Sequence, residues 1–122
     1  MANERVQLKG SNSNDLYPET FKKIGTVTPE SGVTIEEVRC VQVGKIVEIH
    51  FFARGDFSST NDVAVISGVG LPPKNVRTLA GVGSQAYYAS ESRYLIMATN
   101  GKIQIATHSY PYVNVDVVYT VD

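Results

Sequence analysis

The sequence has little of the chemistry on which many protein classes depend. Its 122 residues include one cysteine, Cys40, two histidines and no tryptophan. A single cysteine excludes an internal disulfide framework and a zinc site built from paired cysteines. Because the histidines and Cys40 show no ligand spacing, we expect no metal, and Cys40 is predicted to be a small buried hydrophobic residue. The fold must therefore be held together by packing.

Excess charge of one sign and long apolar runs are also lacking. Lysine and arginine number 11 against 12 aspartate and glutamate residues, a net charge of -1. This balance provides no electrostatic footprint for nucleic acid or anionic lipid. No run approaches the roughly 18 apolar residues that span a bilayer, and the N-terminal MANERVQLKG lacks the apolar segment of a signal peptide. We expect no nucleic-acid partner, no membrane insertion and no export by that route.

Residues branched at Cβ dominate the apolar composition. The chain has 17 Val and 8 Ile against 5 Leu and 8 Ala, a bias that suits a pleated sheet. Ten Gly and five Pro punctuate short apolar alternations, and no helical periodicity extends beyond about two turns. The glycines at positions 68, 70, 81 and 83 precede no helix, so they form no phosphate loop, and we expect no cofactor. The predicted fold class is all-β, a small antiparallel β-sandwich or barrel.

Two polar, turn-rich stretches divide the chain. Residues 10–18 (GSNSNDLYP) are typical of a surface loop, and a second break is expected at Thr26 to Gly32. We therefore assign residues 1–30 to an extended N-terminal arm or connector and residues 31–122 to a compact head domain.

Two hairpins are predicted. A tight turn at Gly44-Lys45 pairs Cys40 with Ile49 and Val38 with Phe51 on the core face. The opposite face then carries Arg39, Glu48 and His50, so Cys40 and His50 diverge and form no nucleophilic pair. The second hairpin turns at Asn100-Gly101, a dipeptide preferred where both turn residues have positive φ. Its register pairs Ala98 with Ile103, Ile96 with Ile105, and Arg93 with His108.

Further strands are expected at Val63 to Ser67, Val76 to Val82 and Val113 to Val121. In the last of these, the odd-numbered residues from Val113 to Val121 form one apolar face. Apolar residues also fall on the outward faces, at Val41, Val43 and Val118. A symmetric contact between copies of the chain would cover them.

Three loops carry aromatic and charged side chains: residues 54–62, 84–92 and 107–112. Tyrosine offers an apolar ring with a hydroxyl group, and aspartate and arginine offer charge-assisted hydrogen bonds that suit the dense hydroxyl groups of a sugar. Loops of this kind form saccharide or protein contact surfaces. The candidate ligand-binding residues are Arg54, Asp56, Tyr87, Tyr88, His108 and Tyr110.

The order of these features is similar to that of a known family. A segment VQLKGSNSNDLYPET precedes a valine-rich hairpin, VISGVGLPPKNVRTLAGVGS, the hairpin RYLIMATNGKIQIATH and a short terminal strand. This order resembles the receptor-binding head of tailed-phage tail-fibre and baseplate proteins, of the type found in phages of Gram-positive bacteria. The resemblance covers most of residues 33 to 122. It implies a homotrimer of β heads at a virion tail tip or baseplate, assembled in the host cytoplasm, that binds host cell-wall saccharides without catalysis. Many such sites stack a sugar on tryptophan, so tyrosine must take that part here.

Three functions remain open. The first is a non-enzymatic adhesin module that recognises a host glycan. The second is a structural or trimerisation domain that contacts other virion tail or baseplate proteins and ignores sugars. The third is a polysaccharide depolymerase, which needs two convergent carboxylates. Asp56 and Asp62 are its only named candidates, and we expect no enzymatic activity.

Overall fold

The computed structural model describes residues 22–85 and 88–121. These residues form nine strands and no helix, which confirms the all-β prediction. The strands are β1 (Lys22–Ile24), β2 (Thr26–Pro29), β3 (Thr34–Val43), β4 (Ile46–Arg54), β5 (Asp62–Ser67), β6 (Val76–Gly83), β7 (Glu91–Met97), β8 (Lys102–Ile105) and β9 (Tyr112–Thr120). Among the described residues, therefore, no helical segment could cross a membrane.

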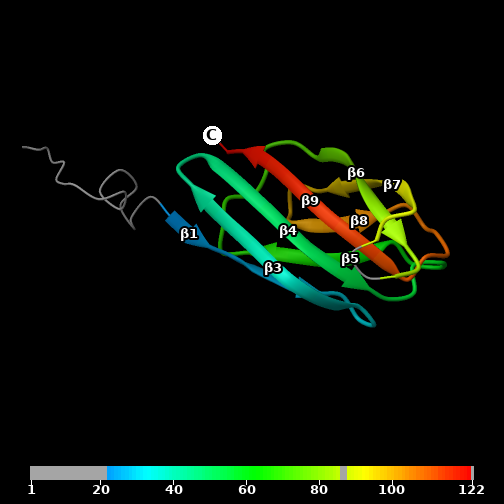
Figure 1. Ribbon diagram of the computed structural model, residues 1–122. Coiled ribbons are helices and arrows are strands. Elements are labelled where there is room, and N and C mark those ends of the chain that lie inside the picture. The colour runs from blue at the N-terminus through cyan, green and yellow to red at the C-terminus, as the bar shows by residue number, and fades with distance from the viewer. Residues whose placement is uncertain (1–21, 86–87, 122) are drawn as a thin grey trace, which may run out of the picture.

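All nine strands belong to one antiparallel sheet, in the order β1-β3-β4-β9-β6-β7-β8-β5-β2. Figure 1 shows β3, β4 and β9 side by side, with β5 and β8 behind them. Strand β6 connects these two layers, because its residues 81–83 pair with β9 while most of its length pairs with β7. The sheet therefore curls back on itself around a single core.

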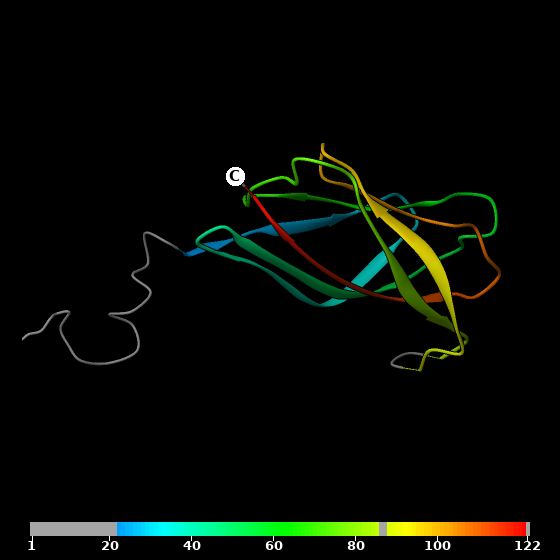
Figure 2. The same ribbon diagram turned by 90° about the horizontal axis from the view of Figure 1, so that it is seen from above.

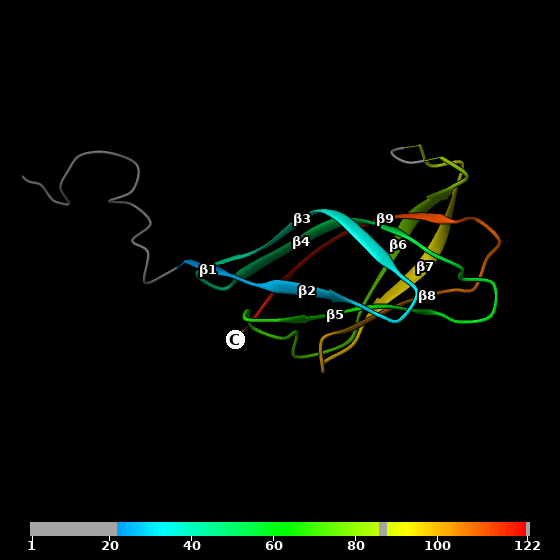
Figure 3. The same ribbon diagram turned by 90° about the horizontal axis from the view of Figure 1, so that it is seen from below.

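The first two strands bring the edges of the sheet together. Strand β1 pairs with β3 and β2 pairs with β5, and only Gly25 separates them in sequence. Figure 3 shows β1 leading directly into β2 along one side of the molecule. The Gly25 amide donates to the Cys40 carbonyl oxygen at 2.8 Å. One short stretch of chain thus nearly closes the sheet into a barrel.

This closure changes the predicted domain boundary. Residues 22–29, assigned above to the arm of residues 1–30, are strands of the barrel, and the break expected at Thr26 to Gly32 begins only after Pro29. Strands of three and four residues are too short to show period-two alternation, and Val27 is the only buried side chain in either of them. The rest of the predicted arm, residues 1–21, lies outside the described residues.

The first hairpin has the predicted turn. Cys40 pairs with Ile49, and Gly44 has a φ of 60° at the first position of the two-residue connection. Cys40 is buried, and desolvation raises the pKa of its thiol, so its prediction as a small core residue is confirmed. The polar face is also confirmed, since the Arg39 guanidinium Nε donates to Glu48 Oε1 at 3.2 Å on the exposed side.

Val38, however, was wrongly predicted to face the core opposite Phe51. A β-bulge interrupts the register between Glu36 and Arg39, and Glu37 there adopts a φ of 54°. The bulge places two residues opposite one and reverses the alternation beyond it. Val38 is consequently 48% exposed, and Ile35 packs against the core instead.

The second hairpin is shifted by one residue from the prediction. Met97 pairs with Ile103 and Leu95 with Ile105, in place of Ala98 with Ile103 and Ile96 with Ile105. The Ala98 amide donates to the Lys102 carbonyl oxygen at 2.9 Å, which closes a three-residue loop. Only Gly101 has a positive φ there, of 90°, so the loop is not the two-residue turn that the Asn-Gly dipeptide suggested.

Because side chains alternate across a strand, the one-residue shift exchanges the core-facing and outward-facing side chains of β7. Leu95 and Met97 are therefore buried, while Ile96 is only partly so. Strand β8 ends at Ile105, so the predicted pairing of Arg93 with His108 within the hairpin is also absent.

The core lies between the two layers. Its largest fully buried side chains include Phe51, Phe57, Ile49, Leu95, Met97, Ile103 and Ile105. Val113, Val115, Val117 and Tyr119 on β9 are buried, and Val121 packs against them, as the alternation predicted. Burial raises the pKa of Tyr119 to about 12, and its hydroxyl donates to the Gly70 carbonyl oxygen at 2.6 Å.

Candidate ligand-binding end of the barrel

The three loops singled out in the sequence gather at one end of the barrel, which we call the loop end: the β4–β5 connection (55–61), the β6–β7 connection (84–90) and the β8–β9 connection (106–111). Figures 1 and 2 show this end on the side away from β1. Backbone hydrogen bonds join two of the loops, from the Gly55 amide to the Pro111 carbonyl oxygen and from the His108 amide to the Phe57 carbonyl oxygen, each at 3.0 Å. Segments far apart in sequence therefore form one surface.

Five of the six predicted ligand-binding residues lie at the loop end. Arg54, Asp56 and Tyr88 are exposed, Tyr110 is half-buried, and His108 is buried. Tyr87, the sixth, lies outside the described residues.

Tyr110 belongs to a charged cluster at the start of β7. Its hydroxyl donates to Glu91 Oε2 at 2.9 Å, and Arg93 Nη1 contacts Glu91 Oε1 at 2.6 Å. The Tyr110 hydrogen bond, and then Arg93, lower the pKa of Glu91, while the same bond raises the pKa of the Tyr110 phenol. Glu91 is therefore a carboxylate at neutral pH, beside an arginine and a positioned tyrosine. The sequence interpretation missed Glu91 and Arg93, because only the fold places their strand beside the 106–111 loop.

Asp56 organises its own loop. Its Oδ1 accepts hydrogen bonds from the Ser58 amide at 3.0 Å and the Ser58 hydroxyl at 2.6 Å, and these bonds lower the pKa of the Asp56 carboxyl. Asp62 has different partners, Gln104 Nε2 at 2.6 Å and Lys102 Nζ at 3.7 Å. The two acids named as hydrolase candidates thus each serve a separate local contact.

His108 lies beneath the surface and supports Tyr110 from below. It is 7% exposed, its Nδ1 accepts a hydrogen bond from the Tyr110 amide at 3.0 Å, and its ring lies 5.5 Å from that of Phe57. Its Nε2 is buried and has no hydrogen-bond partner among the described residues. Desolvation, and then the charge of Arg93, lower the pKa of the imidazole. His108 was predicted to bind ligand, but its buried side chain is not placed for a direct contact with one.

His108 should make the protein less stable in acid. Its pKa is lowered in the folded state, so below the ordinary value of 6.5 the unfolded chain binds a proton that the folded protein does not. Stability should therefore fall as the pH drops below that value, by at most about 1.4 kcal/mol per pH unit from this group. Chemical denaturation of wild type and His108→Gln between pH 7.5 and 5 measures this, and carboxylate effects common to both cancel in the difference. Identical pH slopes would contradict it.

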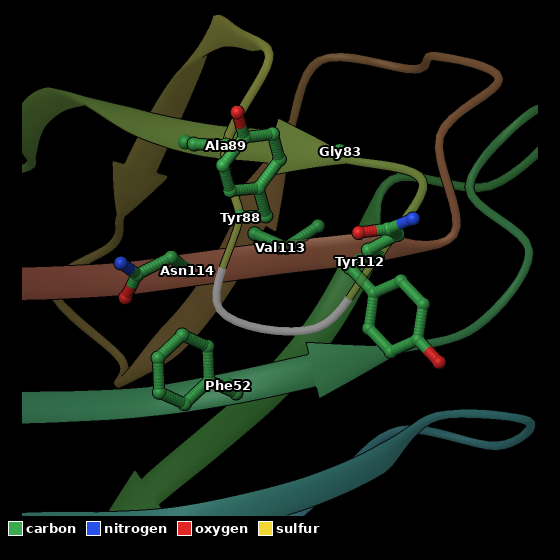
Figure 4. A pocket seen from close by; sticks show the side chains of 9 residues that line it. Phe52, Gly83, Tyr88, Ala89, Tyr112, Val113 and Asn114 are labelled. Carbon is green, nitrogen blue, oxygen red and sulfur yellow. The ribbon is translucent and has the colours of Figure 1, made fainter.

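A small pocket opens on the outer face of the sheet beside the 84–90 loop. Figure 4 shows side chains around it from β4, β9 and the loop. It is lined by Phe52, Gly81, Gly83, Gln85, Tyr88, Ala89, Tyr112, Val113 and Asn114. Its volume of about 20 Å³ is enough for roughly one water molecule.

Glycine makes this pocket possible. A Cβ at Gly81 would lie 2.7 Å from the Ala89 methyl group, and one at Gly83 would overlap the Tyr88 carbonyl oxygen. Because Gly81 and Gly83 have no side chains, the loop can fold back over β6. The Ser90 amide then donates a hydrogen bond to the Val82 carbonyl oxygen at 2.7 Å. Gly81 and Gly83 thus admit another segment of backbone close to the strand.

Asn114 forms part of the pocket floor. In the register of β9 it lies between Phe52 on β4 and Gly81 on β6. Its Oδ1 is buried and accepts no hydrogen bond from any described residue. An unpaired buried acceptor costs about 1–3 kcal/mol. Strand alternation puts Asn114 on the outward face of β9, but it does not show that a distant loop covers this position.

Within residues 22–85 and 88–121, no group of three or more histidine, cysteine, aspartate or glutamate side chains could hold a metal ion. Comparison of the chain with protein-family models, with curated proteins and with solved structures finds no match. The fold and the loop end therefore define this protein as an all-β barrel with an aromatic and charged surface at one end.

Proposed function

We propose that the protein is a non-enzymatic receptor-binding module of a phage tail, and that it recognises a host cell-surface saccharide at the loop end. The observation that carries the proposal is the convergence of three aromatic and charged loops at one end of the barrel. The resemblance to phage receptor-binding heads supports the same function. We place the protein in the virion, at a tail tip or baseplate, beside other tail proteins.

The side chains at this end suit a sugar. Tyr88 is 70% exposed and offers a ring face for the apolar side of a pyranose. Arg54, Asp56 and Tyr110 supply charged and hydroxyl groups for hydrogen bonds to sugar hydroxyls. Asp56 and Tyr110 are already held by Ser58 and Glu91, so little conformational entropy is lost when ligand binds.

A homotrimer fits this function. Arg54, Asp56 and Tyr88 are exposed at each site, which favours weak binding to a single saccharide unit. Three sites on one tail tip would bind a repeating polysaccharide much more tightly through effective concentration, without any new contact.

Loss of the Tyr88 ring should weaken saccharide binding. We expect wild type to bind at least one cell-wall polysaccharide on a glycan array, and Tyr88→Ala to reduce the affinity about tenfold, as loss of an exposed aromatic contact does. Tyr94→Ala is the matched control. Tyr94 is at least as exposed as Tyr88, at 75%, but it lies within strand β7, paired with Leu79, and not in a loop of the loop end. Equal losses in both variants, or no binding by wild type, would contradict the proposal.

A second candidate, a structural or trimerisation domain, is favoured by a specific surface. The outer faces of β1, β3, β4 and β9 carry a group of aliphatic side chains, the aliphatic patch: Ile24, Val41, Val43, Ile46 and Val118. Ile24 is 74% exposed and Val118 58%. A second copy of the chain is the occupant we assign to it. A chain that assembles through this patch, binds a phage protein tightly and ignores every saccharide would establish this second function.

A further inference from the structure

We propose that the Asn114 pocket is a hydroxyl-binding subsite, which takes one hydroxyl group of a saccharide while the sugar ring stays at the rim. This inference rests on the proposed function and deepens it, because Tyr88 is the only one of the described residues first predicted to bind ligand that lines this pocket. It is carried by the cavity and by the buried, unpaired oxygen within it.

The unpaired oxygen defines what the pocket accepts. Asn114 Oδ1 is a buried acceptor with no donor among the described residues, and it lies on the outer face between β4 and β6. Buried polar groups in proteins are almost always paired, so this one calls for a ligand that donates a hydrogen bond. A carboxylate or phosphate oxygen offers only lone pairs and would be repelled. The subsite therefore selects a neutral hydroxyl or amide donor.

The size of the pocket limits how much of the ligand enters. A volume of about 20 Å³ fits a hydroxyl group, which is close in size to water, and excludes a pyranose ring. The ring must therefore remain outside, where Tyr112 and Tyr88 line the pocket together with the Gln85 amide. Figure 4 shows the Phe52, Tyr88, Tyr112 and Asn114 side chains that line the pocket.

The lining of the Asn114 pocket should strengthen a hydrogen bond from a ligand hydroxyl to Asn114 Oδ1. Val113 is 1% exposed, and Ala89 and the two glycines add no polar side chain, so part of the pocket wall is apolar. A hydrogen bond is stronger in such surroundings than in water. The apolar C–H face of a sugar ring can at the same time pack on a tyrosine ring. A pyranose with at least one free hydroxyl beside an apolar face is the ligand that meets these requirements.

The experiment is a two-dimensional NMR titration of the ¹⁵N-labelled full chain. The ligands are methyl glycosides of glucose, galactose, mannose, rhamnose and N-acetylglucosamine, together with cell-wall polysaccharides of Gram-positive bacteria. We expect saturable shifts of the Asn114 side-chain amide and of the backbone at residues 81–83 and 112–114. Asn114→Leu should then reduce the affinity at least about tenfold, since it removes the acceptor at nearly constant size. Asp116→Leu, two residues along the same face of β9, is the control and should bind as wild type does.

The outcomes separate the two proposals. If saccharide binds with shifts confined to residues 54–58 and 108–110, or if a folded Asn114→Leu binds as wild type does, the subsite is wrong and the proposed function stands. If wild type binds none of the saccharides, both are wrong. Should Asn114→Leu fail to fold, the wild-type shift map alone decides.

Discussion

Replacement of Phe57 by alanine should lower the free energy of unfolding by about 3–5 kcal/mol, as removal of a buried aromatic ring does. Phe57 is 1% exposed although it lies in the connection between β4 and β5. Its ring packs in the core, and the centroid of this ring lies 5.5 Å from the centroid of the His108 ring. The Phe57 carbonyl oxygen accepts a hydrogen bond from the His108 amide. The ring is therefore a core residue supplied by a loop, and it fixes the loop end to the barrel.

The effect of Phe57→Ala can be measured by urea denaturation and by thermal melting, where a fall of roughly 15 °C is expected for a domain of this size. Ser59→Ala is the control, since Ser59 is exposed in the same loop and its replacement should change stability by less than about 0.5 kcal/mol. If Phe57→Ala were as stable as Ser59→Ala, the packing of the loop end described here would be wrong.

The second large effect is expected at the closure of the barrel. A Cβ at Gly25 would lie 2.6 Å from Cys40 Sγ, 2.7 Å from the Ser67 carbonyl oxygen and 2.9 Å from Val69 Cγ1. Two of these neighbours belong to β3 and β5, the strands that β1 and β2 join. Gly25→Val must therefore push the two edges apart, and we expect it to destabilise the fold by about 3 kcal/mol.

Hydrogen exchange locates this effect as well as measuring it. In Gly25→Val the amides of β1, β2 and their partners in β3 and β5 should exchange faster than those of β9 and β6 in the middle of the sheet. Thr26→Ala, at an exposed neighbouring position, should leave the exchange pattern unchanged. Uniform protection in Gly25→Val, with unaltered stability, would contradict a sheet whose two edges are held together at this point.

Period-two alternation predicted the strands that are long and half-buried. It gave the odd-numbered core face of β9 and the pairing of Cys40 with Ile49 correctly, because both depend only on local periodicity. It failed at the bulge after Glu36 and at the Asn100-Gly101 turn, where one extra residue reverses the two faces. Such irregularities depend on how a strand twists against its neighbours, which a single run of residues does not show.

The candidate site was predictable only in part. The loops that carry Arg54, Asp56, Tyr88 and Tyr110 were recognisable from composition, and they do lie at one end. The burial of Phe57 and His108, the contact of Glu91 with Tyr110, and the orphaned oxygen of Asn114 were not. Each of these depends on which distant segments the closed sheet brings together, so each required the fold.

Binding to whole cells is the most direct test of saccharide recognition at the loop end. Fluorescently labelled protein is added to intact Gram-positive cells, with and without soluble cell-wall polysaccharide from the same strain, and bound fluorescence is measured. Saturable binding to at least one strain, abolished by the soluble polysaccharide and weakened in Tyr88→Ala but not in Tyr94→Ala, is the predicted result. Binding that soluble polysaccharide does not reduce, or that both variants retain in full, would contradict recognition of a surface saccharide at this end of the barrel.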